Sequence, residues 1–204
     1  MSTPTRPTTD AAATDQIGVV ADVIATAFHR LAVSKWLVAD PEERFAAQRG
    51  QFGIIVEHAA EHGRIYLDAD HRAAAVWLDY TQPIPEPADY DRRLFDLCGP
   101  HTPRFAALDV AFEENHPRVA HQHLAFMAVL PEYQEQGLGS ELVAAHHEVL
   151  DREGTPAYLE AANLRVARMY GKWGYRIISR IDLPGGPSMW PMWRDPSAAG
   201  EGRR

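Results

Sequence analysis

The chain has 204 residues, 46% of them hydrophobic and 24% charged, a balance typical of a globular domain with one substantial core. The formal net charge is −8, from 20 Lys and Arg against 28 Asp and Glu, and it argues against a nucleic-acid partner because phosphate binding needs a basic excess. The one cysteine, Cys98, excludes an intrachain disulfide and a thiolate zinc cluster, and it fits a reducing cytosol.

Both ends of the chain are poor in side chains that a core could bury. Residues 1–14 are mostly Thr, Pro and Ala, and residues 196–204 are similar, so we expect disordered tails around one domain over residues 15–195. No run approaches the roughly 20 apolar residues of a membrane span, and no apolar signal region follows Met1. The sequence predicts a soluble, cytoplasmic protein with no membrane partner.

The first part of the domain predicts two helices. Apolar residues recur at three- and four-residue spacing from Ile17 to Phe28, with Asp15 as the expected cap. A second helix is predicted over residues 41–62, where Asp40 supplies a capping carboxylate and Pro41 suits the first turn. The segment between these helices is expected to be a loop.

A hairpin and a further helical region come next. Residues 64–68 and 73–80 are short apolar runs separated by Asp70-His71, which predicts two antiparallel strands with a polar turn. Residues 88–116 are expected to be mostly helical.

The second half of the chain alternates strands and helices. Residues 121–130 are too apolar for an edge strand, so they are predicted to form a buried central strand that Pro131 ends. The elements expected after it are a helix over 137–154, a strand over 156–160, a helix over 163–173 and a strand pair over 175–181 and 188–194. The order of these elements is βαβαββ.

Two glycines, Gly137 and Gly139, stand where the first of these later helices begins. Glycines there let backbone N–H groups converge on an anion, and the helix dipole favours a phosphate. The alternative is that both glycines only satisfy the steric needs of a tight turn. A P-loop is excluded because Ser140-Glu141 lacks its lysine, and a Rossmann turn is excluded because Leu142 replaces its third glycine.

This turn resembles the Q/R-x-x-G-x-G/A motif of the GNAT acetyltransferases. Gln134, Gly137 and Gly139 occupy its fixed positions, and Val129-x-Pro131 precedes it. The turn departs from the usual pattern in carrying Glu135-Gln136 where Gly and Lys or Arg are common. We expect this departure to weaken cofactor binding modestly, because backbone donors do the main work.

A second block of the same superfamily, N-x6-Y-x3-G-F/Y, is matched downstream. Asn163 and Tyr170 occupy its first positions, and Gly174-Tyr175 ends it with Tyr in place of the usual Phe. The two motifs stand in the order typical of the superfamily.

Further segments are most similar to the puromycin N-acetyltransferase-like branch. They are residues 137–140, 156–160 and 183–187 with Trp190 and Met192 in the second half, and Ala27-Phe28, Asp40-Pro41 and Ala75-Val76-Trp77 in the first. The resemblance covers most of residues 15–194.

The resemblance implies an α/β (α+β) fold with a mixed, mostly antiparallel central sheet flanked by helices. The fourth and fifth strands would splay apart and admit the pantetheine arm of acetyl-CoA, the implied cosubstrate. The residues expected to bind acetyl-CoA are the backbone of Met127, Ala128 and Val129, the turn residues Gln134, Gln136, Gly137, Leu138, Gly139 and Ser140, and Asn163. Asn163 has capping of its own helix as an alternative role, and the two roles do not conflict.

Tyr170 stands where the superfamily has a general acid that protonates the departing thiolate, although packing on the sheet is its alternative role. His121 and His123 share one face of their strand because side chains alternate. We prefer His121 as the base, since histidine titrates near neutral pH, and take Glu160 on the neighbouring strand as the second choice. A polar pair near solvent is the alternative for the histidines. His123 and Trp36 are expected to line the acceptor pocket.

The predicted function is therefore an acetyl-CoA-dependent N-acetyltransferase that acts on an amine of a small molecule, an antibiotic or another metabolite, by direct attack. No metal is expected, because no third ligand accompanies the two histidines. The alternatives are a catalytically silent acyl-CoA-binding or regulatory module and a protein amine acetyltransferase. A homodimer is left open.

Overall fold

Seven strands form one mixed sheet in the computed structural model, which describes residues 12–197. Their order is β1-β2-β3-β4-β7-β5, and β6 pairs with β7 outside this path. The strands are β1 (Gly63–Leu67), β2 (Ala73–Tyr80), β3 (His121–Val129), β4 (Ala157–Ala161), β5 (Arg176–Ile177), β6 (Ile181–Asp182) and β7 (Ser188–Arg194). Every pair is antiparallel except β3 with β4, which confirms the mixed, mostly antiparallel sheet.

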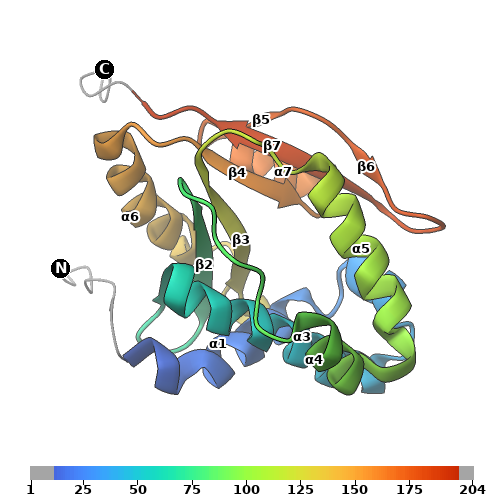
Figure 1. Ribbon diagram of the computed structural model, residues 1–204. Coiled ribbons are helices and arrows are strands. Elements are labelled where there is room, and N and C mark those ends of the chain that lie inside the picture. Colours follow the sequence, from blue (N-terminus) through green and yellow to red (C-terminus); the bar gives the residue numbers. More distant parts are fainter. Residues whose placement is uncertain (1–11, 198–204) are drawn as a thin grey trace.

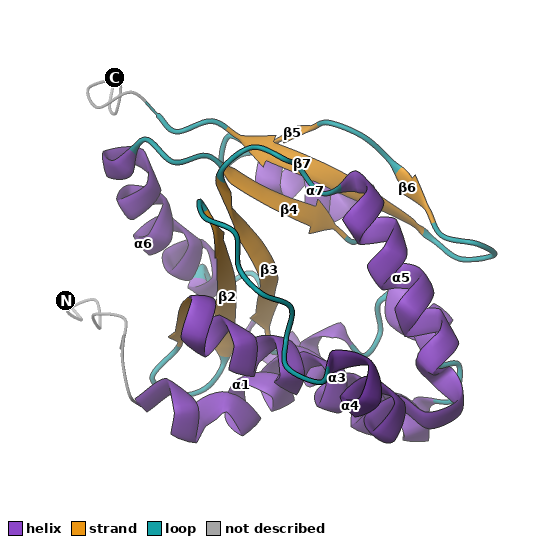
Figure 2. Ribbon diagram, viewed as in Figure 1, coloured by secondary structure: helices purple, strands orange, loops and turns teal. Residues whose placement is uncertain are grey.

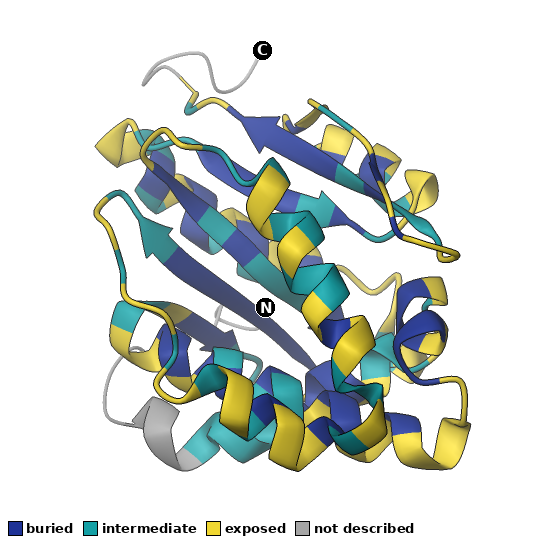
Figure 3. Cartoon of the chain, turned by 45° about the vertical axis from the view of Figure 1, so that its right-hand side comes forward, coloured by how far each residue is buried: buried dark blue, intermediate teal, exposed yellow. Residues whose placement is uncertain are grey.

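Helices cover both faces of the sheet (Figures 1 and 2). They are α1 (Ala12–Phe28), α2 (Ala32–Leu37), α3 (Pro41–His62), α4 (Tyr90–Cys98), α5 (Thr102–Asn115), α6 (Leu138–Glu153) and α7 (Leu164–Gly171), with 3-10 turns at Gly99–His101 and Pro131–Tyr133. One core, with Ile24 and Phe52, packs α1 and α3 on one face, and a second, with Leu150 and Leu159, packs α6 and α7 on the other. A third core joins α2, α4 and α5 to β6. Figure 3 shows the central strands largely buried and the outer helix faces exposed.

Helix α1 begins at Ala12, earlier than the sequence predicts. Asp15 therefore lies inside the helix, and its prediction as the cap is wrong. The helix extends upstream through alanines, which have the highest intrinsic helix propensity. Residues 12–14 belong to this helix and not to a tail, whereas residues 1–11 and 198–204 lie outside the described residues.

The segment between α1 and α3 was expected to be a loop, but it contains the six-residue helix α2. A helix this short depends on tertiary packing, which the spacing of its own residues does not reveal. Helix α3 has its predicted bounds, and the carboxylate of Asp40 accepts a hydrogen bond from the amide of Glu42 at 2.8 Å. Helices α4 and α5 confirm the helical region expected over 88–116.

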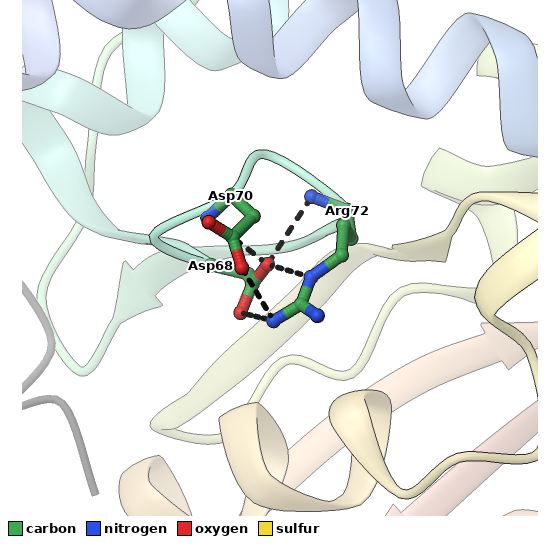
Figure 4. Close-up of polar contacts among 3 residues, drawn as sticks. All are labelled: Asp68, Asp70 and Arg72. Carbon is green, nitrogen blue, oxygen red and sulfur yellow. Dashed lines mark hydrogen bonds and ion pairs between the residues drawn. The ribbon is translucent and has the colours of Figure 1, made fainter.

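The hairpin of β1 and β2 is confirmed, and a charged turn closes it (Figure 4). Asp68 accepts two hydrogen bonds from the Arg72 guanidinium, at 2.7 and 3.0 Å, and Asp70 lies 3.1 Å from the same group. These hydrogen bonds from Arg72 hold the pKa of Asp68 below its usual value. The guanidinium also lies over the ring of Tyr133, 5.7 Å from its centroid. The hairpin turn therefore contacts the segment that follows β3.

Strands β3 and β4 separate soon after they meet. Their parallel pairing consists of Gln122 with Ala157 and His123 with Tyr158. Beyond these pairs β3 follows β2 as far as Val129, while β4 follows β7. The expected splay is thus present, but it lies between the third and fourth strands in chain order, because the described chain before β1 is entirely helical or loop.

The strand predicted over residues 175–181 is divided into the two-residue strands β5 and β6. The amide of Ile178 still donates to the carbonyl of Pro191 at 2.9 Å, but Pro191 has no N–H to donate in return. The ladder with β7 is therefore interrupted at this proline.

Candidate active site

A cavity of about 1540 Å³ occupies the region where β3 and β4 separate. Residues of α6 and α7, such as Ser140 and Tyr170, line one side of it. Residues of α3, α4 and α5, such as Phe52, Tyr90 and Asp109, line the other. Side chains from both faces of the sheet therefore share one space.

The glycine turn enters α6 through the left-handed region. Glu135 has a φ of 64° and Gly137 a φ of 91°, which glycine adopts at the lowest cost. The amide of Glu141 donates to the carbonyl of Gly137 at 3.0 Å, so the amides of residues 138–140 have no acceptor within the helix. Residues 138–140 line the cavity, and their amides with the positive end of the helix dipole suit a phosphate.

Glycine is favoured at the two positions of the turn for different reasons. A Cβ on Gly139 would lie 2.9 Å from the sulfur of Met127 and 3.3 Å from a methyl of Val129, so a larger residue here would force these side chains of β3 to shift. A Cβ on Gly137 would meet no atom within 4 Å, and the positive φ alone accounts for glycine there. The steric role of these two glycines does not conflict with the phosphate-binding role that the sequence predicts.

The glutamines of the turn stabilise its shape. Nε2 of Gln134 donates to the carbonyl of Val129 at 3.1 Å, and Nε2 of Gln136 donates to the carbonyl of Glu132 at 3.2 Å. Gln134 lines the cavity, whereas the side chain of Gln136 points along the turn and is absent from the lining.

The end of β3 borders the cavity along an edge that β4 has left. Met127 and Val129 line the cavity, while the side chain of Ala128 is buried in the core under α1 and α3. The backbone groups on this edge have no strand partner beyond His123. Such groups can hydrogen-bond an extended amide-containing chain, as a pantetheine arm is.

Three cations line the cavity at α7: Arg165 and Arg168 within the helix and Lys172 directly after it. Arg165 also lies 3.3 Å from Glu135 of the glycine turn. Sequence reasoning missed these residues, although their spacing of three and four positions signals one helix face. They supply the positive charge that the turn itself lacks.

Tyr170 lies in α7 with its ring against Trp173 and Tyr175, and it also lines the cavity. Burial raises the pKa of Tyr170 well above its ordinary value, so its hydroxyl carries its proton at neutral pH. Asn163 caps α7 by accepting a hydrogen bond from the amide of Val166 at 3.0 Å, and it borders the cavity as well.

Glu160 and His123 form a buried pair on the face of the sheet that is opposite to α6 and α7. Nε2 of His123 lies 2.8 Å from Oε2 of Glu160, whose side chain is 5% exposed. Burial alone would raise the pKa of Glu160, but the charge and hydrogen bond of His123, with the charge of His116, hold it below its usual value. Oε1 of Glu160 and Nδ1 of His123 have no partner among the described residues, and both side chains line the cavity.

His121 does not occupy the position expected of a base. It begins β3 at the closed end of the gap, is fully buried, and is absent from the cavity lining. Its Nδ1 lies 2.8 Å from the carbonyl of Val119, and its ring stacks on Tyr80. Burial lowers the pKa of His121, which further disfavours it as a proton acceptor. The structure therefore does not bring His121 and Glu160 together in the cavity, because β4 leaves β3 beyond His121. It brings together Glu160 and His123, which we prefer as candidates for the base.

Trp36 is also displaced from its expected role. It lies in α2 and not in a loop, its Nε1 donates to the carbonyl of Pro184 at 3.2 Å, and Arg104 stacks on its ring. The side chain packs against Gly186 and does not line the cavity. Trp36 therefore fixes the β6–β7 loop onto α2.

The comparison with known families matches part of this region. Residues 104–177 match the family described as Acetyltransferase (GNAT) domain, a span that includes the glycine turn, Glu160 and Tyr170. This part of the chain is therefore similar in sequence to the GNAT acetyltransferase domain.

Solved structures share the fold over nearly the whole chain. A histone acetyltransferase HPA2 and related acetyltransferase from Corynebacterium glutamicum is similar with a TM-score of 0.67 and 23% identity, over 96% of this chain and 97% of that one. Arylalkylamine N-acetyltransferase 2 from Aedes aegypti gives 0.61 and 10% identity, over 94% and 99%. A putative acetyltransferase of the GNAT family from Desulfovibrio desulfuricans gives 0.51 and 14% identity, over 94% and 98%. At these identities the likeness demonstrates a common fold.

Residues 12–197 contain neither a clustered set of metal ligands nor a membrane-spanning helix. No group of three His, Cys, Asp or Glu side chains in this range is arranged to hold a metal ion. None of the helices within the range combines the length and apolar character needed to cross a membrane.

Proposed function

We propose that this protein is an acetyl-CoA-dependent N-acetyltransferase that acetylates an amine of a small molecule by direct attack. The observation that carries the proposal is that one cavity joins the free amides of α6, the protonated Tyr170 and the Glu160–His123 pair. A binding module would need the first of these features but neither of the others.

The phosphate end of acetyl-CoA fits the glycine turn. The amides of residues 138–140 and the cations Arg165, Arg168 and Lys172 are suited to its phosphates. The unpaired edge of β3 at Met127–Val129 is suited to its pantetheine amides. When bound, acetyl-CoA supplies the acetyl group as a thioester.

The Glu160–His123 pair accepts a proton from the substrate ammonium, because a protonated amine has no lone pair for attack. The neutral amine then forms the new carbon–nitrogen bond. Tyr170 donates its phenolic proton to the sulfur as the carbon–sulfur bond breaks. The attacking nitrogen then loses its second proton, which restores the phenol of Tyr170, so that the products are a neutral amide and a thiol. The lowered pKa of Glu160 and the raised pKa of Tyr170 keep the two groups in the protonation states these steps need.

A small acceptor is favoured over a protein amine by the walls of the cavity. Residues of α3, α4, α5 and the loop at residues 84–87 form walls around its acceptor end. Within the superfamily, the segments at 137–140, 156–160 and 183–187 support a puromycin N-acetyltransferase-like branch. The proposed enzyme is cytoplasmic and consists of a single domain. The proposal does not specify whether it forms a homodimer.

A screen of small amines with detection of released thiol tests the proposal. We expect free CoA to form only when an acceptor amine is present. Acetyl-CoA binding with no thiol release for any amine would favour the silent binding module. Release only with peptide amines would favour the protein acetyltransferase.

A further inference from the structure

The acceptor end of the cavity is rich in carboxylates. The inference drawn from this observation rests on the proposed function and extends it. Four carboxylates line this end: Glu86, Asp91, Asp109 and Glu113. They belong to α4, α5 and the loop at residues 84–87, which surround this end together with α3. These elements contribute no Lys or Arg to the lining. The lining cations are Arg118, between α5 and β3, and Arg165, Arg168 and Lys172 at α7. Carboxylates therefore outnumber cations where the acceptor would enter, and three cations lie where acetyl-CoA phosphates would bind.

Asp109 is the best-positioned of these carboxylates. It is partly buried on α5, and the hydroxyl of Tyr90 on α4 donates to its Oδ2 at 2.9 Å. Burial, assisted by the neighbouring charge of Asp91, raises the pKa of Asp109 to about 6. A carboxylate held at this depth gains from a cation that lies beside it.

Gln48 on α3 provides an independent sign of a ligand at this wall. Its side chain is 1% exposed and lines the cavity, and its Nε2 donates to Oγ of Ser34 at 2.8 Å. Its Oε1 has no hydrogen-bond partner among the described residues. Buried acceptors are normally paired, so this oxygen calls for a donor that enters the cavity.

The base end of the cavity has its own unpaired acceptor, Oε1 of Glu160. One ammonium group at Glu160 would leave the carboxylate of Asp109 without a cation beside it and the oxygen of Gln48 without a donor. We propose that the acceptor is a small molecule with two cationic groups, of which Glu160–His123 engages the reacting amine and Asp109 with Gln48 binds the second. The substrate class is thus a diamine or a comparable dication.

The test measures amine binding by calorimetry on the full chain in the presence of CoA, so it does not depend on turnover. Diaminoalkanes from diaminobutane to diaminooctane are compared with the n-alkylamines of the same chain length. We expect at least one diamine to bind about tenfold more tightly than its monoamine. Asp109→Asn should abolish this preference while changing monoamine affinity less than about twofold.

Glu114→Gln is the matched control, because Glu114 is exposed on the same helix and outside the cavity lining. It should retain the full preference. Asp91→Asn is a second variant, which should reduce the preference about threefold through the neighbouring charge. A wild-type protein without a diamine preference, or a preference that survives both Asp109→Asn and Asp91→Asn, overturns the proposal. An Asp109-dependent preference without acetylation of any amine supports this site and contradicts the proposed transferase activity.

Discussion

Tyr170 on α7 and Glu160 on β4 line the same cavity, and their pKa values are shifted in opposite directions. Burial raises the pKa of Tyr170. Burial acts in the same direction on Glu160, but the charge and hydrogen bond of His123, the Tyr158 hydroxyl and the charge of His116 together lower the pKa of that carboxyl. Two titratable groups whose environments push their pKa values apart are suited to act as acid and base. The proposed chemistry thus rests on where α7 and β4 place these two side chains.

Tyr170→Phe removes the proton donor and keeps the ring that packs against Trp173 and Tyr175. We expect turnover to fall about 10- to 1000-fold, as is usual when a proton-transfer group is removed, with little change in the dissociation constant of acetyl-CoA. Steady-state kinetics and calorimetry on the folded variant measure both values. Turnover equal to that of the wild type would assign Tyr170 to packing alone.

Glu160→Gln should lower the rate at neutral pH and leave it nearly normal at high pH. Common amines have a pKa near about 10, so they lose the proton without a base once the pH approaches that value. The measurement is a pH–rate profile, with His121→Gln as the matched control. The control should lose thermal stability, since His121 is fully buried, but its profile should run parallel to that of the wild type. The reverse pattern would return the role of base to His121.

The sequence predicted these site residues only in part. Alternation along a strand correctly predicted that His121 and His123 share a face, but it did not tell which of them borders the cavity. That depends on where β4 leaves β3, and the pairing ends at His123 and Tyr158. The role expected of Trp36 failed for a similar reason, because its partner Pro184 is remote in the chain.

At the scale of elements, the N-terminus of α6 is the feature that the glycine motif predicts most directly. Gly137→Val adds a side chain at the open end of the turn, where we expect the phosphates to approach, so CoA binding should weaken at least about tenfold. Its positive φ also makes the substitution costly to stability, by about 1 kcal/mol or more.

Gly154→Val separates these two effects. Gly154 ends the same helix at φ 68°, also with no atom within 4 Å of a built Cβ, and it lies outside the cavity lining. We expect a similar loss of stability with unchanged CoA affinity, measured by thermal unfolding and calorimetry. Equal CoA affinity in both folded variants would show that the phosphates of CoA do not bind at the glycine turn.

Most elements could be predicted from the sequence because their signals are local. The Asp40 cap, the hairpin runs and the glycine that begins α6 each act within a few residues. Helix α2 and the division between β5 and β6 were missed, because the first depends on packing against α3 and α5 and the second on Pro191 of a partner strand. Long-range contacts determined the elements that local patterns did not predict.

At the scale of the whole molecule, two buried histidines of α6 form hydrogen bonds to residues of the sheet and of the segment before β5. The hydroxyl of Tyr66 on β1 donates to Nδ1 of His146 at 2.9 Å, and Nε2 of His146 donates to Oε1 of Gln122 on β3 at 2.7 Å. His147 bonds the hydroxyl of Tyr175 at 3.0 Å. Helix α6 is therefore joined to β1, β3 and the segment before β5 by neutral imidazoles.

This arrangement predicts a fold that loses stability in mild acid. Burial lowers the pKa of His146 to about 3 and that of His147 to about 4, from an unfolded value of 6.5. Between these values the unfolded chain binds more protons than the folded one, so the stabilisation is complete above about pH 6.5 and declines toward about pH 4. Each such histidine contributes a slope of up to about 1.4 kcal/mol per pH unit to the free energy of unfolding.

His146→Gln should lower the free energy of unfolding at neutral pH and make its fall with acid shallower, because one group no longer titrates. Denaturant unfolding at several values from about pH 7.5 to about pH 4.5 measures that slope. His101→Gln is the control, since His101 is partly exposed and pairs with Glu43 at the surface, and it should keep the wild-type slope. A slope that His146→Gln leaves unchanged would mean that the acid sensitivity arises elsewhere, in the carboxylates or in the other buried histidines.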